Sequence, residues 1–146
     1  MRKGQRDSLY IVIVGCGRLG SILANGLSRA GHAVVVIDRD AATFKDLSSD
    51  FSGFRIEGDV TELAVLREAK LQGADVFIAT THEDNVNLMA AQLARGIFNV
   101  PQVLARVFDP RREEVYAQLG IETICPTSVG AEMFLLAVAS GMVRRR

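Results

Sequence analysis

A run of apolar residues leads directly into a glycine motif near the start of the chain. Residues 11–20 read IVIVGCGRLG, a strand pattern followed by Gly-x-Gly-x-x-Gly and then by apolar residues at helical spacing. Each glycine has a mechanical role in a strand–turn–helix unit. Gly15 allows the tight turn, Gly17 lets a phosphate group approach the backbone, and Gly20 lets the helix pack close to the strand. The motif therefore predicts a turn that binds phosphate on the free N–H groups of the helix N-terminus.

Strand and helix patterns alternate along the rest of the chain. Strands are predicted at residues 9–14, 33–37, 54–57, 75–79, 102–107 and 121–124. Helices are predicted at residues 18–30, 41–48, 61–70, 84–95, 110–119 and 128–143. Thr61 is the expected N-cap of the third helix. The alternation indicates an α/β fold, a Rossmann-like doubly wound parallel sheet with helices on both faces and strand order 3-2-1-4-5-6.

Size and charge narrow the class of protein. A length of 146 residues fits one domain, which we expect over residues 9–146 after a flexible N-terminal tail at 1–8. The formal net charge of zero argues against a nucleic-acid-binding surface. The strongly apolar stretch at 133–143 is too short to span a bilayer as a helix, and no signal-peptide pattern precedes the first strand. We therefore expect a soluble, cytoplasmic protein.

The two cysteines do not indicate a metal site. Cys16 and Cys125 are far apart in sequence, and neither belongs to a Cys-x-x-Cys motif or a Cys/His cluster with metal-ligand spacing. We expect two free thiols and no metal ligands. No activating base stands beside either cysteine in the sequence, so a catalytic thiol is not expected.

Asp38 follows the second predicted strand, about 20 residues after the glycine motif. A carboxylate at that place accepts hydrogen bonds from both ribose hydroxyls and repels a 2′-phosphate, which favours NAD or a plain adenosine nucleotide over NADP. Arg39 weakens this discrimination, because arginine pairs well with a 2′-phosphate. The alternative is that Asp38 caps the following helix.

Arg18 lies in the first turn of the helix that follows the glycine motif. A cation is unfavourable there, because the helix dipole places partial positive charge at the N-terminus. Pairing with a bound phosphate would explain the residue. The alternative is an arginine that points into water.

Polar residues follow the third and fourth predicted strands, beside the expected ligand crevice. Asp59, in the sequence Gly-Asp-Val-Thr at 58–61, would contact the adenine amino group or cap the next helix. Residues 80–85 read TTHEDN, a density of polar groups that suits hydrogen bonding, although helix capping also explains Thr81 and Asp84.

The crevice offers little for catalysis. His82 is the one histidine expected near it, as a general acid–base group or as a plain loop residue. There is no Tyr-x-x-x-Lys pair, no lysine in the crevice, and no second domain to hold a substrate over a nicotinamide ring. The site therefore indicates nucleotide binding without turnover. The alternative is a small NAD-dependent oxidoreductase or a fragment of one.

Together these stretches resemble the N-terminal lobe of RCK domains, also called KTN or TrkA-N domains. The resemblance covers about residues 9–143, and its most specific parts are G-D-x-T at 58–61 and T-x-x-x-D-N-x-N at 80–87. It implies that the glycine loop and Arg18 hold phosphates, Asp38 the ribose, and the residues after the third and fourth strands the adenine side. The complete predicted binding set is Gly15, Cys16, Gly17, Arg18, Leu19, Gly20, Asp38, Arg39, Asp59, Val60, Thr80, Thr81, His82, Glu83 and Asn85.

The resemblance also implies a function. The family consists of cytosolic regulators of Trk and Ktr potassium uptake systems and of potassium channels, and it binds NAD(H), ATP, ADP or AMP. We therefore expect a non-enzymatic regulatory subunit that gates a membrane potassium transporter from the inner face of the cell membrane. Family regulators usually continue into a second, C-terminal lobe. Here we expect either a single-lobe regulator or a second lobe encoded as a separate chain.

The last predicted helix, 128–143, is apolar around most of its circumference. A helix that packs on one face of a sheet needs only one apolar stripe, so the excess predicts a partner. The apolar residues are Val129, Met133, Phe134, Leu135, Leu136, Val138, Met142 and Val143. In the resembling family this helix crosses onto a neighbouring subunit, which implies a homodimer or a higher oligomer. The alternative is a helix buried wholly within its own domain.

Overall fold

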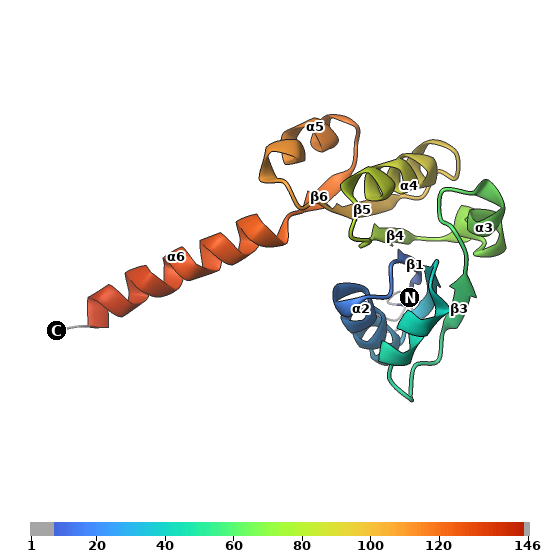
Figure 1. Cartoon of the computed structure of the whole chain (residues 1–146), viewed down its shortest axis with the longest axis horizontal. Coiled ribbons are helices and arrows are strands. Elements are labelled where there is room, and N and C mark those ends of the chain that lie inside the picture. Colours follow the sequence, from blue (N-terminus) through green and yellow to red (C-terminus); the bar gives the residue numbers. More distant parts are fainter. Residues whose placement is uncertain (1–7, 145–146) are drawn as a thin grey trace, which may run out of the picture.

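Six parallel strands form one sheet in the computed structural model, which describes residues 8–144 (Figure 1). The strands are β1 (Tyr10–Val14), β2 (Ala33–Asp38), β3 (Phe54–Glu57), β4 (Val76–Ala79), β5 (Gln102–Arg106) and β6 (Glu122–Ile124). Their order is β3-β2-β1-β4-β5-β6, which confirms the predicted Rossmann-like topology. Every neighbouring pair is parallel. The predicted N-terminal tail lies outside the described residues, except for Ser8.

The helices are α2 (Arg18–Arg29), α3 (Leu63–Glu68), α4 (Asp84–Gly96), α5 (Glu113–Gln118) and α6 (Pro126–Arg144). Three short 3-10 helices are η1 (Ala41–Asp46), η2 (Leu71–Gly73) and η3 (Pro110–Arg112). The segment predicted as a helix at 41–48 is therefore a 3-10 helix that ends two residues earlier. Gly31 follows α2 with φ of +97°, as expected for a residue beyond a helix C-terminus.

The prediction of Thr61 as an N-cap is wrong. Asp59 Oδ1 accepts hydrogen bonds from the Thr61 amide at 2.9 Å and from the Thr61 hydroxyl at 2.7 Å. This local turn delays the helix, so that α3 begins only at Leu63 and its N-cap is Glu62. Asp59 therefore holds the turn that precedes α3. This role is similar to the alternative in which Asp59 caps the helix.

Alternate residues of β1 supply the two layers of the core. Ile11 and Ile13 pack with Ala24 of α2, whereas Val12 and Val14 belong to the cluster on the opposite face. That opposite cluster includes Leu66 of α3 and the small residues Ala90, Ala91 and Ala94 of α4. Because α2 and α4 cover opposite faces, the chain leaves the carboxyl ends of β1 and β4 in opposite directions. The gap between these ends is the expected ligand crevice of an open α/β sheet.

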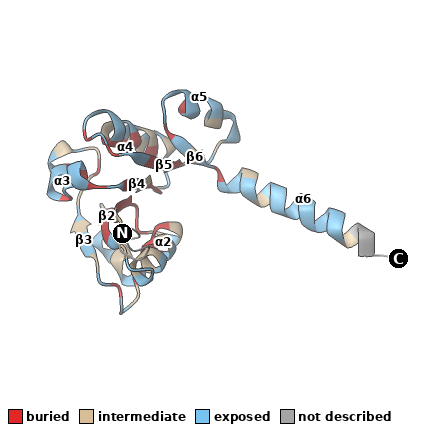
Figure 2. Cartoon of the chain, turned by 180° about the vertical axis from the view of Figure 1, so that it is seen from behind, coloured by how far each residue is buried: buried red, intermediate tan, exposed pale blue. Residues whose placement is uncertain are grey.

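Helix α6 leaves the sheet and projects away from it (Figures 1 and 2). It begins at Pro126, two residues before the predicted start, with proline in the first turn, where its missing N–H costs nothing. Most of its described side chains are exposed, so the alternative of a helix buried in its own domain is wrong. Despite its apolar composition, neither α6 nor another helix within residues 8–144 is long and apolar enough to cross a membrane.

Candidate functional site

Gly15 and Gly20 form a close backbone contact at the end of β1. Gly15 has φ of +97°, and a Cβ atom added there would lie 2.9 Å from Oγ1 of Thr80. A Cβ atom on Gly20 would lie only 1.8 Å from the Gly15 carbonyl oxygen. The predicted tight turn and the close approach of helix to strand are both confirmed. Thr80 completes the turn, because its hydroxyl donates to the Val14 carbonyl at 2.9 Å.

Gly17 leaves the N-terminus of α2 open. It is the N-cap residue, no side chain caps the helix, and the first turn contains no acidic residue. The helix hydrogen bonds begin with the amide of Ser21, which donates to the Gly17 carbonyl at 2.9 Å. A Cβ atom on Gly17 would meet only Nε2 of His82, at 3.7 Å. Uncapped amides next to open space are the arrangement that binds a phosphate.

The Asp38 carboxylate joins the end of β2 to the glycine loop. Its Oδ2 accepts a hydrogen bond from the Cys16 amide at 2.8 Å, and its Oδ1 accepts one from the Asp40 amide at 2.8 Å. A carboxylate has about four acceptor positions, so each oxygen can still accept from a hydroxyl group. Capping of η1 falls instead to Asp40, whose Oδ1 accepts from the Ala42 amide at 3.0 Å.

Cys16 contributes its backbone to this arrangement rather than its thiol. Its side chain is fully buried, and both Cys16 and Cys125 are free thiols, as predicted. Burial, together with the negative charge of Asp38, raises the pKa of the Cys16 thiol to about 11. A thiol of that acidity is neutral near pH 7 and unsuited to nucleophilic attack.

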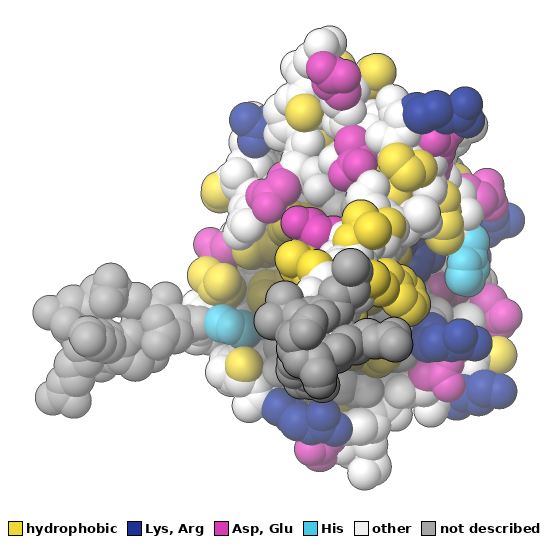
Figure 3. All heavy atoms as spheres, turned by 90° about the vertical axis from the view of Figure 1, so that its left-hand side faces the viewer, with side chains coloured by type: hydrophobic (Ala, Val, Ile, Leu, Met, Phe, Trp, Pro, Cys, Tyr) yellow, Lys and Arg dark blue, Asp and Glu magenta, His cyan; other side chains and the backbone are white. Residues whose placement is uncertain are grey.

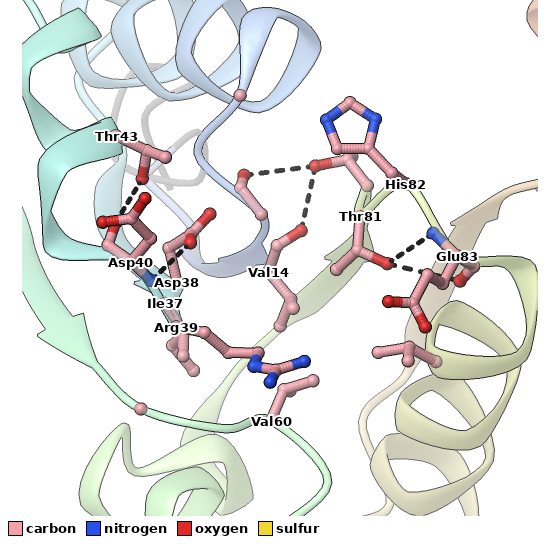
Figure 4. A pocket seen from close by; sticks show the side chains of 15 residues that line it. Val14, Ile37, Asp38, Arg39, Asp40, Thr43, Val60, Thr81, His82 and Glu83 are labelled. Atoms are coloured by element: carbon pink, nitrogen blue, oxygen red, sulfur yellow. Dashed lines mark hydrogen bonds between the residues drawn. The ribbon is translucent and has the colours of Figure 1, made fainter.

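A cavity of about 300 Å³ lies over the carboxyl ends of β1, β2 and β4 (Figure 4). Nine predicted residues line it: Gly15, Gly17, Asp38, Arg39, Val60, Thr80, Thr81, His82 and Glu83. Six further residues complete the lining: Val14, Ile37, Asp40, Thr43, Gly58 and Val86. Asp38, Asp40 and Thr43 lie on one side of the cavity, across from the segment after β4 (Figure 4).

Six predicted residues do not line this cavity. The Cys16 side chain and Gly20 of α2 are buried in the protein, and Arg18 and Leu19 line a second cavity beyond His82. The two cavities share His82. The structure thus separates Arg18 from Asp38, because the helix turns the arginine away from the end of β2.

The other two, Asp59 and Asn85, are engaged elsewhere. The hydrogen bonds from Thr61 hold the pKa of Asp59 below its usual value, while its neighbours Gly58 and Val60 line the cavity. Asn85 is exposed and accepts a weak hydrogen bond from Arg112 at 3.4 Å. Asp59 lies at the edge of the cavity, and Asn85 lies on the outer side of α4.

Asn87 is a structural residue of the site that the sequence reading did not assign. It is fully buried, and its Oδ1 accepts from the Thr81 amide at 2.9 Å and hydroxyl at 2.7 Å. Its Nδ2 donates to the carbonyls of Thr81 and Arg106, both at 3.1 Å. Asn87 therefore holds the segment after β4 against the end of β5. The signal was an amide inside the T-x-x-x-D-N-x-N motif.

The cavity combines apolar walls with hydrogen-bond acceptors. Val14, Ile37, Val60 and Val86 supply apolar surface of the kind that packs against a flat ring. The carboxylates of Asp38, Asp40 and Glu83 supply acceptors for hydroxyl or amino groups. Among the described residues no group of three or more His, Cys, Asp or Glu side chains could hold a metal ion. These features fit a nucleoside with a phosphate on the glycine loop.

Comparison with known proteins identifies the family. The TrkA-N domain model matches residues 11–126. The chain belongs to the TrkA-N family. This TrkA-N chain is 46% identical over 127 residues to the Trk system potassium uptake protein TrkA of Streptomyces coelicolor. The match covers 87% of this chain and 57% of that relative, so the chain spans a little over half of the relative's length.

Solved structures share the TrkA-N fold. The GsuK RCK domain is 26% identical, with a TM-score of 0.74 over 88% of this chain and 27% of that chain. The GsuK channel bound to NAD is 21% identical, with a TM-score of 0.68 over 82% of this chain and 21% of that chain. The Kef CTD of Shewanella denitrificans in AMP bound form is 20% identical, with a TM-score of 0.78 over 93% of this chain and 83% of that chain. The last two show likeness of fold alone.

Proposed function

We propose that this TrkA-N domain binds an adenine nucleotide, either NAD(H) or one of ATP, ADP and AMP. The observation that carries the proposal is the hydrogen bond of 2.8 Å between the Cys16 amide and the Asp38 carboxylate. It ties a carboxylate suited to ribose hydroxyls to the uncapped N-terminus of α2, where a phosphate is stabilised. This bond would hold the ribose and phosphate positions relative to each other before a ligand binds.

The chemistry of the other residues around the cavity indicates what each would do. The adenine ring would lie against Val60 and Val86, within reach of Glu83 as an acceptor for its amino group. The Arg39 side chain extends from the end of β2 toward Val60, so its guanidinium would lie near the adenine ring (Figure 4). Thr80 and Asn87 hold backbone groups of the site in place.

We further infer a regulatory role in potassium transport without catalysis. The Streptomyces relative is named as a Trk potassium uptake protein, and the GsuK neighbour is a channel structure bound to NAD. The partner would be the membrane subunit of a potassium transporter, which this domain would gate from the cytoplasmic face. Helix α6 would join two or more copies.

Calorimetric titration with NADH, ATP, ADP and AMP tests the binding proposal. We expect at least one dissociation constant in the micromolar range and no consumption of NADH. Asp38→Asn should weaken binding of the nucleotide by roughly tenfold, because hydrogen bonds to a charged acceptor are lost. Asp50→Asn is the matched control, since Asp50 is exposed, pairs with Arg29 and lies outside the cavity.

Three outcomes would contradict the proposal. Absence of binding by all four nucleotides would refute it, and equal affinity in Asp38→Asn would refute the ribose assignment. Loss of NADH absorbance with a panel of carbonyl substrates would instead favour the oxidoreductase alternative.

A further inference from the structure

A second cavity of about 910 Å³ lies beside the first, on the far side of His82. Two cationic side chains line it, Arg18 from α2 and Arg106 from the end of β5. Among its described lining residues Asp46 is the one acidic side chain. Arg18 belongs to the glycine motif. Arg106 belongs neither to the glycine loop nor to the residues predicted to contact the ribose and the adenine.

Arg106 is charged, partly buried and poorly paired. Its Nη2 donates to the Thr81 carbonyl at 2.9 Å, and its guanidinium lies 4.6 Å from the centre of the Phe108 ring. Its Nε is buried without a hydrogen-bond partner among the described residues. No Asp or Glu within residues 8–144 forms a salt bridge with it.

Such a guanidinium is costly without an anion. Burial penalises its charge and lowers its pKa, yet an arginine remains charged under ordinary conditions. Packing against Phe108 and one carbonyl contact leave most of its five N–H donors for another acceptor. A group held in this way at a cavity wall is suited to bind phosphate oxygens.

We propose that Arg106 recognises the phosphates of the nucleotide beyond the first one, and so selects nucleotides with at least two phosphates over AMP. The inference rests on the proposed function, which places the first phosphate on the α2 N-terminus at Gly17. His82 lies next to Gly17 and belongs to both cavities, so a phosphate chain that continues past it enters the second cavity. There it meets Arg106 as well as Arg18.

Calorimetry with AMP and ADP on the whole chain tests this inference. ADP should bind the unmodified protein roughly tenfold more tightly than AMP, and Arg106→Gln should remove most of that ratio while AMP affinity changes less than about threefold. Glutamine removes the charge, while the hydrogen bonds between Asn87 and Thr81 still hold the loop after β4. Arg106→Lys should restore part of the preference because it keeps the charge.

Arg29→Gln is the matched control, since Arg29 is exposed and lines neither cavity. Equal loss of AMP and ADP affinity in Arg106→Gln would mean that Arg106 only supports the loop, and would overturn the inference. So would an unchanged ratio in that variant, or equal affinity of the unmodified protein for AMP and ADP. If none of NADH, ATP, ADP and AMP binds the unmodified protein, the proposed function itself fails. If NADH or ATP binds but neither AMP nor ADP does, only the inference about Arg106 is overturned, which separates the two failures.

Discussion

Gly15 and Gly20 touch where no other residue type fits. The carbonyl oxygen of Gly15 occupies the place that a Cβ atom on Gly20 would take, which brings α2 directly against the end of β1. Gly26 is in the same helix, is exposed, and has nothing within 4 Å of an added Cβ. Gly20 therefore has no room for a methyl group, whereas Gly26 has.

We predict opposite effects on stability for the two alanine variants. Gly20→Ala should lower the free energy of unfolding by about 1–3 kcal/mol, because the methyl group forces the helix away from the turn. Gly26→Ala should raise it by about 0.5–1 kcal/mol, since alanine restricts the unfolded chain and favours the helix. Urea unfolding measures both. Similar urea midpoints for the two variants would contradict the close contact.

Helix α6 exposes large apolar side chains that its own domain does not cover. Phe134, Leu135, Leu136 and Val138 are each at least 60% exposed. Consecutive residues are about 100° apart around a helix, so these side chains do not form one stripe. Figure 3 views the molecule from the side to which α6 extends and shows hydrophobic side chains gathered near the centre of that face. Met142 and Val143, also predicted as apolar contacts, have side chains outside those described.

We predict that the chain self-associates through α6. The double variant Phe134→Glu with Leu135→Glu should weaken association by about a hundredfold, because two carboxylates would be buried without partners. Sedimentation equilibrium would show the mass shift from an oligomer toward a single chain.

Phe54→Glu is the matched control for this prediction. Phe54 is 73% exposed on the edge strand β3 and lies away from α6, so its substitution should leave the mass unchanged. A single-chain mass for the unmodified protein at micromolar concentrations would refute the role of α6. An oligomer that survives the double variant would refute it equally.

At the scale of the whole molecule, titrating groups predict that the free energy of unfolding falls both at low pH and at high pH. Hydrogen bonds from Arg111 hold the pKa of Asp109 at about 2, and those from Thr61 lower the pKa of Asp59. Between the usual carboxyl range near 4 and about 2, the unfolded state binds more protons than the native state. Stability should therefore fall as the pH falls through this window.

The fall in stability at high pH comes from a group whose pKa is raised in the native state. The Cys16 thiol keeps its proton up to about pH 11 in the native state, whereas an ordinary thiol ionises near 9. Above pH 9 the unfolded state has lost a proton that the native state retains, so stability falls as the pH rises. Urea midpoints at pH 7 and 10 should show the decline, and Cys16→Ala should make it shallower. An equal decline in the variant would contradict the assignment to Cys16.

The topology and the glycine turn could be predicted from the sequence because both depend on local order. Alternating strand and helix patterns follow from side-chain periodicity, and the spacing from Gly15 to Gly20 is set within one turn of backbone. Asp38 was found for the same reason, since it directly follows a strand whose end must lie beside the loop. The start of α3 was missed because Asp59 offers the Thr61 amide a competing local bond.

The sequence by itself determined the α/β sheet, its strand order, the phosphate-binding turn and the excess of apolar residues in the last helix. Only the tertiary structure decided that Arg18 faces a different cavity from Asp38, and that Arg106 and Asn87 meet at Thr81. Arg106 and Thr81 are distant in the chain and come together because β4 and β5 pair in parallel. Such meetings depend on strand register and on the angle at which each helix leaves the sheet, neither of which a local pattern specifies.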